Sequence, residues 1–347
     1  HFHSSLMNPP GFLQPTLPSN RCVVDCCQVR ENRTQVENPA PLVAIAGPTG
    51  SGKSDLAVEL ARRIPGEVIN CDSVQAYRYF DVGTAKLTAQ EQRGVPHHLL
   101  DYLDPDQPFT AGDFARAARA LAAGITATGR LPIVAGGTGF YLRALTEGLP
   151  PAPESDAALR RDLLDRESRR PGLLHRALRR LDPPSALRIH PNDTRKLSRA
   201  VEVCLLAGRP LSELGSAPRE PLTGFRTLKI ALDPPREELY RRLDARVERM
   251  FQSGLVEETR GILGRGYART CKPFESLGYR QAVRVITGEM SIEEAIEATR
   301  RDTRRYAKRQ WTWFRREPGV EWIRGFGGEP AVADAVVARV ERFVAGG

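Results

Sequence analysis

The residues from Gly47 to Ser54 form the clearest chemical pattern in the chain. Their sequence, Gly-Pro-Thr-Gly-Ser-Gly-Lys-Ser, matches the phosphate-loop pattern GxxxxGK[ST]. The small residues allow backbone N–H groups to surround a phosphate at the N-terminus of the following helix. Lys53 adds a positive charge, and the Ser54 hydroxyl is a candidate ligand for Mg²⁺. We therefore predict a di- or triphosphate site made by Gly47, Pro48, Thr49, Gly50, Ser51, Gly52, Lys53 and Ser54.

A carboxylate, Asp72, is expected to face this phosphate site. It follows an apolar run at 67–71, and ligands of a parallel sheet bind at the carboxyl ends of its strands. Enzymes that hydrolyse ATP or GTP on such a loop usually hold Mg²⁺ with an Asp at the end of another strand. Here the apolar run at 131–135 leads instead into Gly136-Gly137-Thr138. Asp72 could thus be a metal ligand, a base for a hydroxyl or another nucleophile, or a helix N-cap.

The elements that must position these residues indicate an α/β fold. Strands that alternate with helices imply a doubly wound parallel sheet of the P-loop class. Residues 151–222 carry only helical signals, which predicts an all-helical insertion domain. The predicted strands are 42–46, 67–71, 131–135 and 227–232, and the predicted helices outside the insertion include 55–63, 110–127, 235–252, 254–265, 275–286 and 291–316. Two of these helices begin with capping-box patterns, Thr110 with Asp113 and Ser291 with Glu294.

These patterns divide the chain into four parts. The catalytic core is expected at 41–150 and 223–325, the insertion at 151–222 and a C-terminal helix at 326–347. Residues 1–40 are rich in Pro, Asn, Ser and Cys and lack the charged and apolar regions of a signal peptide. We interpret them as a disordered leader or an over-long gene start.

The composition excludes several classes of protein. A hydrophobic share of 41% with 27% charged residues is typical of a folded domain and not of a disordered chain. No apolar run is long enough to cross a membrane, and the six Cys residues have no zinc-site spacing. The net charge of +9 favours a polyanionic partner. We expect a cytoplasmic monomer.

Several further motifs resemble those of the tRNA dimethylallyltransferases, also called tRNA isopentenyltransferases. The first is Cys-Asp-Ser-Val-Gln-Ala-Tyr-Arg at 71–78. The others lie in the same order as in that family, at 81–86, 97–101, 109–114, 136–141, 188–193, 199–202, 277–281 and 307–315. The likeness extends over about residues 41–325, and the motifs are specific only when taken together.

The resemblance implies a prenyl transfer. In that family, dimethylallyl diphosphate gives its dimethylallyl group to N6 of the adenosine 3′ to the anticodon, position 37 of tRNA, and diphosphate leaves. This explains a phosphate loop without a second strand-end carboxylate, because no water has to be activated. The resemblance makes Asp72 the base that takes the N6 proton. It also makes Thr138, Arg242 and Arg246, together with Lys53 and Mg²⁺ on Ser54, stabilise the leaving diphosphate.

The resemblance also implies a surface for the anticodon stem-loop of tRNA. The target base has to be flipped out of its stack to reach Asp72. The family's RNA contacts fall on Asp72, Ser73, Val74, Gln75, Thr138, Arg160, Arg195, Lys196, Leu197, Ser198, Arg199 and Arg280. Arg195-Lys196 stands where the family commonly has Gln-Arg, which leaves the details of base recognition open. Arg78 and Lys86 are further candidates for phosphate or RNA contacts.

Three alternatives remain from the sequence. An adenylate isopentenyltransferase would carry out the same chemistry on free nucleotide, but it has no use for a basic insertion. A P-loop small-molecule kinase would need a set of lid arginines and a pocket for the ATP base, neither of which the sequence indicates. An RNA-binding protein with a vestigial loop is disfavoured because Lys53, Ser54, Asp72 and Thr138 are all intact.

Overall fold

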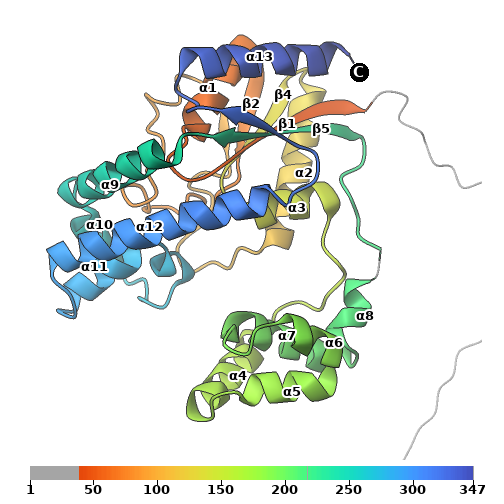
Figure 1. The fold of residues 1–347 in the computed structure, drawn as a ribbon, viewed down its shortest axis with the longest axis vertical. Coiled ribbons are helices and arrows are strands. Elements are labelled where there is room, and N and C mark those ends of the chain that lie inside the picture. The colour runs from red at the N-terminus through yellow and green to blue at the C-terminus, as the bar shows by residue number, and fades with distance from the viewer. Residues whose placement is uncertain (1–38, 217, 347) are drawn as a thin grey trace, which may run out of the picture. The chain divides into compact units, whose positions relative to one another are not determined.

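A computed structural model describes residues 39–216 and 218–346 of the 347-residue chain, so the predicted leader lies outside the described residues except for Pro39 and Ala40. Its centre is a six-stranded sheet in which all neighbouring strands are parallel. The strand order is β3-β2-β4-β1-β5-β6 (Figure 1). The strands are β1 (Ala40–Ala46), β2 (Gly66–Asn70), β3 (His97–His98), β4 (Leu131–Ala135), β5 (Phe225–Asp233) and β6 (Val320–Arg324).

Helices cover both faces of the sheet, which confirms the predicted doubly wound class. Alternate residues of β1 point to opposite faces, as the two-residue period of a strand requires. Leu42 and Ala44 pack with α2 (Ala111–Ala127) and α3 (Gly139–Glu147), whereas Val43 and Ile45 pack with α1 (Lys53–Arg63) and α13 (Pro330–Ala345). The pattern predicted for α2 is also confirmed, because Thr110 and Asp113 form a reciprocal capping box.

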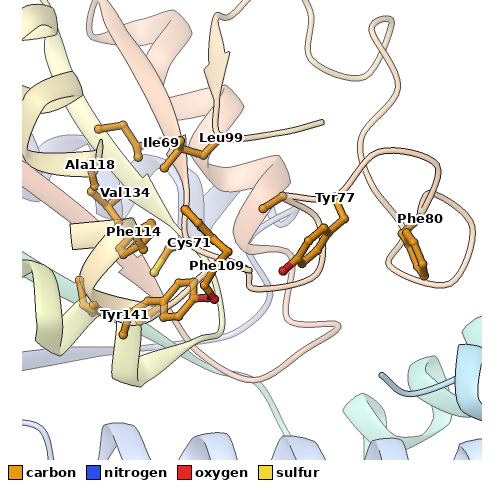
Figure 2. Packing of buried hydrophobic residues seen from close by; sticks show 14 of the residues in the cluster. Ile69, Cys71, Tyr77, Phe80, Leu99, Phe109, Phe114, Ala118, Val134 and Tyr141 are labelled. Atoms are coloured by element: carbon orange, nitrogen blue, oxygen red, sulfur yellow. The ribbon is translucent and has the colours of Figure 1, made fainter. Parts of the chain in front are cut away.

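Aromatic side chains fill the space beneath the loop that follows β2 (Figure 2). Phe114 of α2 stacks on Tyr141 of α3 with ring centroids 4.8 Å apart, and Phe109 meets the same ring edge-on at 6.0 Å. Tyr77 and Phe80, on the loop that follows β2, belong to the same core. The residues after β2 therefore rest on a rigid base although they form no regular element.

Four helices follow β5, namely α9 (Arg236–Gln252), α10 (Leu255–Gly264), α11 (Tyr279–Ile286) and α12 (Ile292–Phe314). The Ser291–Glu294 capping box opens α12 as predicted. The helix predicted at 275–286 is present but begins later, at Tyr279, because a 3₁₀ turn at Lys272–Glu275 precedes α11. Gly278 separates the two with a φ of 85°, a left-handed conformation that an α-helix cannot contain. Strands β3 and β6 were not predicted.

Five helices lie between α3 and β5: α4 (Ala157–Arg169), α5 (Leu173–Leu181), α6 (Pro183–Arg188), α7 (Thr194–Ala207) and α8 (Leu211–Gly215). They have a small core of their own, in which Leu174, Leu178 and Leu197 are fully buried. Within the described parts of 151–222 there is no strand, as predicted. No helix among the described residues has the length and apolar character needed to span a bilayer.

Candidate active site

The phosphate loop joins β1 to α1 with the geometry that its sequence predicts. Gly50 and Gly52 have φ angles of 77° and 84°, which a side chain would strain. A Cβ on Gly52 would also lie 2.9 Å from the backbone nitrogen of Gly327, so another chain segment lies directly against the loop. The amide nitrogens from Gly52 onward lie at the N-terminus of α1, where an anion is stabilised, whereas the Ser51 nitrogen donates to the Pro48 carbonyl.

Lys53 is held inside this loop. Its Nζ donates to the carbonyl of Pro48 at 2.7 Å, which keeps the ammonium folded over the loop. Burial lowers the pKa of Lys53 to about 8, while the negative charge of Asp72 opposes that drop in pKa. The charged ammonium is thus poorly solvated, and a phosphate group that replaces the missing water would bind strongly to it.

Asp72 lies two residues beyond the end of β2 and lines a cleft next to the phosphate loop. Its Oδ1 accepts hydrogen bonds from the backbone nitrogens of Val74 at 2.9 Å and Gln75 at 3.3 Å. Among the described residues no protein donor bonds to its Oδ2. The alternative that Asp72 caps a helix is wrong, because a turn and no helix follows it. Its Oδ1 caps this turn, and Oδ2 is available to accept a proton.

Thr138 supports the Asp72 segment from β4. Its Oγ1 accepts from the backbone nitrogen of Ser73 at 3.2 Å, and its own nitrogen donates to the carbonyl of Cys71. The approach is so close that a Cβ on Gly136 would lie 2.1 Å from the Cys71 carbonyl oxygen. Burial and the charge of Asp72 raise the pKa of the Cys71 thiol, which keeps it protonated.

Arg242 and Arg246 lie one turn apart on α9 but point to different places. Arg246 borders the cleft, donates from Nη2 to the carbonyl of Thr84 at 3.0 Å and leaves its buried Nε without a partner in the structure. Burial lowers the pKa of its guanidinium. Arg242 instead pairs with Glu238 at 2.9 Å and stacks on Phe326, with its Cζ 3.5 Å from the ring centroid. The two arginines therefore have different surroundings, although their spacing in the sequence places them on the same face of α9.

A cleft of about 400 Å³ brings these groups together. Thr49 of the phosphate loop, Asp72 and Arg246 line one part of it. The turn before α11 and the residues Thr303, Tyr306 and Arg309 of α12 line the rest, and Arg195 of α7 also borders it.

Two residues of α12 were missed as members of the site. The side chain of Gln310 connects the phosphate loop with the loop that follows β4. Its Oε1 accepts from the Thr49 nitrogen at 2.8 Å, and its Nε2 donates to the Gly137 carbonyl at 2.9 Å. Tyr306 faces the Asp72 charge, which together with burial raises the pKa of its phenol. Gln310 lies inside the 307–315 motif, but nothing local indicates what it contacts.

The predicted RNA-binding residues of the insertion fall into three groups. Arg195 and Lys196 are exposed, with 81% and 72% of their side chains accessible. Leu197 and Ser198 are buried in the core of the insertion. The remaining two, Arg160 and Arg199, bind the buried carboxylate of Glu202 at 2.5 and 2.9 Å. Arg195 and Lys196 are therefore the most accessible to a ligand, whereas Arg160 and Arg199 are partly exposed and already paired with Glu202.

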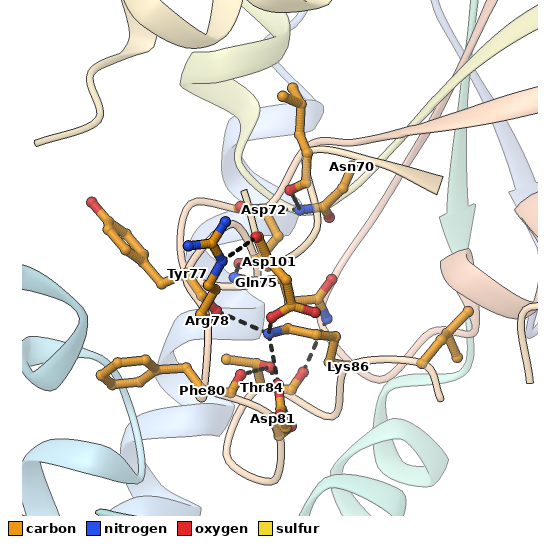
Figure 3. A network of polar contacts seen from close by, with 12 residues as sticks. Asn70, Asp72, Gln75, Tyr77, Arg78, Phe80, Asp81, Thr84, Lys86 and Asp101 are labelled. Atoms are coloured by element: carbon orange, nitrogen blue, oxygen red, sulfur yellow. Dashed lines mark hydrogen bonds and ion pairs between the residues drawn. The ribbon is translucent and has the colours of Figure 1, made fainter. Parts of the chain in front are cut away.

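Three basic residues predicted to contact RNA or phosphate lie outside the insertion. Lys86 is buried between Asp81 and Asp101, with Nζ 2.6 and 2.7 Å from their carboxylates, so it has a structural role (Figure 3). Arg78 bonds to the backbone carbonyl of Asp101 and to Asp104. Arg280 borders the cleft and pairs with Asp302 at 2.5 Å.

The match to known families is extensive. Residues 75–317 match the model of the family described as IPP transferase. The chain belongs to the IPP transferase family. It is 58% identical over 304 residues to a tRNA dimethylallyltransferase of Solibacter usitatus, which covers 88% of this chain and 99% of that one. A tRNA dimethylallyltransferase of Koribacter versatilis is 52% identical over 84% of this chain and 95% of its own length.

Solved structures agree with this family membership. A tRNA isopentenylpyrophosphate transferase of Bacillus halodurans has a TM-score of 0.64 and 37% identity, covering 89% of this chain and 96% of that one. A eukaryotic dimethylallyltransferase, described as acting on tRNA, has a TM-score of 0.75 and 28% identity over 88% of this chain and 80% of its own. These likenesses confirm both the family predicted from the motifs and the P-loop fold class.

Proposed function

We propose that this protein transfers the dimethylallyl group of dimethylallyl diphosphate to N6 of the adenosine at position 37 in tRNA. The observation that carries the proposal is the cleft itself, in which a phosphate loop, a carboxylate oxygen without a protein donor and a buried arginine meet. Family membership supports the reaction class.

The phosphate side of the cleft binds and then stabilises the leaving group. The diphosphate lies on the amides of the loop and on the Lys53 ammonium, with Arg246 adding a second cation. As the bond between the allylic carbon and the bridging oxygen breaks, its electron pair stays on that oxygen, and these groups hold the growing negative charge. Arg242, which stacks on Phe326, supports this side of the site from outside and does not touch the diphosphate.

The acceptor side activates a weak nucleophile. The N6 lone pair of adenosine is delocalised into the ring, so removal of its proton assists the attack on the allylic carbon. Asp72 takes that proton on the oxygen that faces the cleft, and Thr138 keeps the segment in place through Ser73. Ser73, Val74 and Gln75 then lie beside the flipped base.

A magnesium ion fits the donor set of the loop. The described residues contain no cluster of three or more His, Cys, Asp or Glu side chains, so the protein alone provides no complete metal cage. Mg²⁺ commonly takes few protein ligands and completes its shell with phosphate oxygens and water. The Ser54 hydroxyl, at the start of α1 beside Lys53, would be one such ligand. When bound, the ion would neutralise charge on the diphosphate.

The RNA is held by cations around the cleft. Arg195 and Lys196 are exposed on α7, and Arg195 borders the cleft. Arg280 and Arg309 border the same cleft from α11 and α12. Such contacts favour a stem-loop over a free nucleotide, because AMP offers a single phosphate. We infer in addition that the protein works as a monomer in the cytoplasm.

The decisive test of the proposed base is a pair of matched carboxylate variants. Asp72→Asn keeps the size of the side chain but removes its basicity, whereas Asp106→Asn makes the same change at an exposed position. With labelled dimethylallyl diphosphate and an unmodified anticodon stem-loop, single-turnover transfer should fall about 10²- to 10⁴-fold in Asp72→Asn and stay unchanged in Asp106→Asn. Binding of inorganic diphosphate should persist in both. Transfer by Asp72→Asn within about threefold of the wild type would remove Asp72 as the base.

A further inference from the structure

The segment 79–86, which follows the Asp72 strip, is held in an unusual backbone conformation. Tyr79 and Ala85 have φ angles of 72° and 47°, in a region that residues with a side chain rarely adopt. A loop of this kind keeps its shape only when surrounding contacts hold it. On one side those contacts come from Lys86, whose Nζ bonds to Asp81, Asp101 and the carbonyl of Tyr77 (Figure 3).

On the other side the contacts come from two residues far along the chain. The carboxylate of Glu258, on α10, accepts from the backbone nitrogens of Asp81 at 3.3 Å and Val82 at 3.0 Å. The hydroxyl of Tyr279, at the start of α11, donates to Glu258 at 2.5 Å and accepts from the Gly83 nitrogen at 3.0 Å. Three consecutive amides of the segment are therefore bound by one carboxylate and one phenol.

The fit between these residues and the segment is tight. A Cβ on Gly83 would lie 2.4 Å from a ring carbon of Tyr279, whose ring is fully buried. Because the Tyr279 ring cannot be reached from the cleft, its hydroxyl has no direct part in binding a substrate. Its contacts point only into the segment and to Glu258.

The segment in turn holds two side chains of the site. The carbonyl oxygen of Thr84 accepts from Nη2 of Arg246 at 3.0 Å and from Nε2 of Gln75 at 3.1 Å. Arg246 belongs to the diphosphate side and Gln75 to the strip beside the flipped base. One carbonyl therefore connects Arg246, which lines the cleft, with Gln75 at the end of the Asp72 strip, and its position depends on the amides that precede it.

We propose that Glu258 and Tyr279 form a clamp that positions Arg246 and Gln75 through the Thr84 carbonyl. This inference rests on the roles proposed above for Arg246 and Gln75. Neither clamp residue touches the substrate. Their effect is to keep the guanidinium aimed at the diphosphate and the amide aimed at the base, so that both substrates meet a preformed site.

The test is a double-mutant cycle built on Tyr279→Phe. This change removes the hydroxyl and keeps the ring, and Tyr141→Phe is a matched control because it removes another buried phenolic hydrogen bond, to the Phe109 carbonyl. We expect Tyr279→Phe to lower kcat/KM for prenyl transfer about tenfold, as loss of an outer support typically does. In an Arg246→Ala background, Tyr279→Phe should lower kcat/KM by less than about twofold, because Tyr279 acts largely through Arg246.

A second readout does not depend on prenyl transfer. Calorimetric binding of inorganic diphosphate should weaken in Tyr279→Phe and in Glu258→Gln, and it should stay at the wild-type level in Tyr141→Phe. If the wild type transferred no prenyl group, the proposed function would fail, and this binding experiment would still decide on the clamp. Equal losses from Tyr279→Phe in the wild-type and Arg246→Ala backgrounds, or unchanged diphosphate binding in both clamp variants, would show that Glu258 and Tyr279 only stabilise the fold.

Discussion

As the pH rises, Lys53 should lose its proton, and with it the charge that binds diphosphate, well below the pH range in which lysines usually titrate. Its pKa is lowered from 10.5 to about 8, first by burial, with Asp72 acting in the opposite direction. At about 1.4 kcal/mol per pH unit, that change makes the charged form about 3 kcal/mol less favourable than in water. Because dimethylallyl diphosphate is an anion, the form that binds it is the protonated one.

The expected size of the effect follows from the pKa of about 8. Lys53 is about 90% protonated at pH 7 and about 10% protonated at pH 9, so kcat/KM for dimethylallyl diphosphate should fall about tenfold over this interval. Bound diphosphate stabilises the ammonium and raises its pKa again. Binding at pH 8 should therefore take up about half a proton, whereas binding at pH 6.5 should take up almost none.

Two measurements check this titration. The first is a pH profile of kcat/KM from pH 6.5 to 9.5 at saturating stem-loop. The second is calorimetry of inorganic diphosphate binding in buffers that differ in ionisation enthalpy, which counts the protons taken up. Lys53→Gln should bind weakly and lose the inflection near pH 8. A profile that is flat to pH 9.5 in the wild type, or an inflection that survives in Lys53→Gln, would show that the Lys53 ammonium does not control diphosphate binding.

Three further changes have effects that the structure ranks in advance. Arg246→Ala should reduce kcat/KM by about 10²-fold, and Arg242→Ala should reduce it by less than about threefold, because only Arg246 borders the cleft; equal losses in steady-state assays would contradict this. The double variant Arg195→Ala, Lys196→Ala should bind the stem-loop with a weaker salt dependence, because two phosphate contacts are lost. The slope of log affinity against log salt concentration should fall in magnitude by about two, and an unchanged slope in a binding titration would exclude both residues as phosphate contacts. Glu202→Leu should lower the free energy of unfolding, measured in urea, by about 2 kcal/mol. This loss is smaller than for a fully buried ion pair, because the two arginine partners of Glu202 are partly exposed. An unchanged urea midpoint would show that this cluster does not stabilise the insertion.

Local signals in the sequence were sufficient where the chemistry is local. The phosphate loop, its strand and its helix share one stretch of chain, and small residues with a Lys and a Ser specify their geometry directly. The capping boxes of α2 and α12 are equally local and were confirmed. Strand β3 has only two residues, and β6 has no buried position and no strict alternation of exposed and half-buried residues, so both depend on pairing with a neighbouring strand.

The site itself depends on contacts that sequence spacing does not contain. Arg242 and Arg246 share a helix face, but Arg242 stacks on Phe326, which is distant in sequence, whereas Arg246 lines the cleft. Lys86 is basic and lies in a family motif, yet two aspartates bury it. Gln310 connects two loops that are 261 and 173 residues away in sequence. Each outcome is set by the folded arrangement of segments and not by the residue type.

Whether this cleft prenylates N6 of an adenosine in tRNA is decided by comparing possible acceptors of the prenyl group. Purified protein, Mg²⁺ and labelled dimethylallyl diphosphate are incubated with an anticodon stem-loop that has adenosine 3′ of the anticodon, with the same stem-loop carrying guanosine there, and with AMP. We expect label in the adenosine stem-loop alone, recovered after digestion as N6-dimethylallyladenosine. Label in AMP but not in RNA would indicate an enzyme of free nucleotides, and intact dimethylallyl diphosphate in every reaction would contradict prenyl transfer altogether.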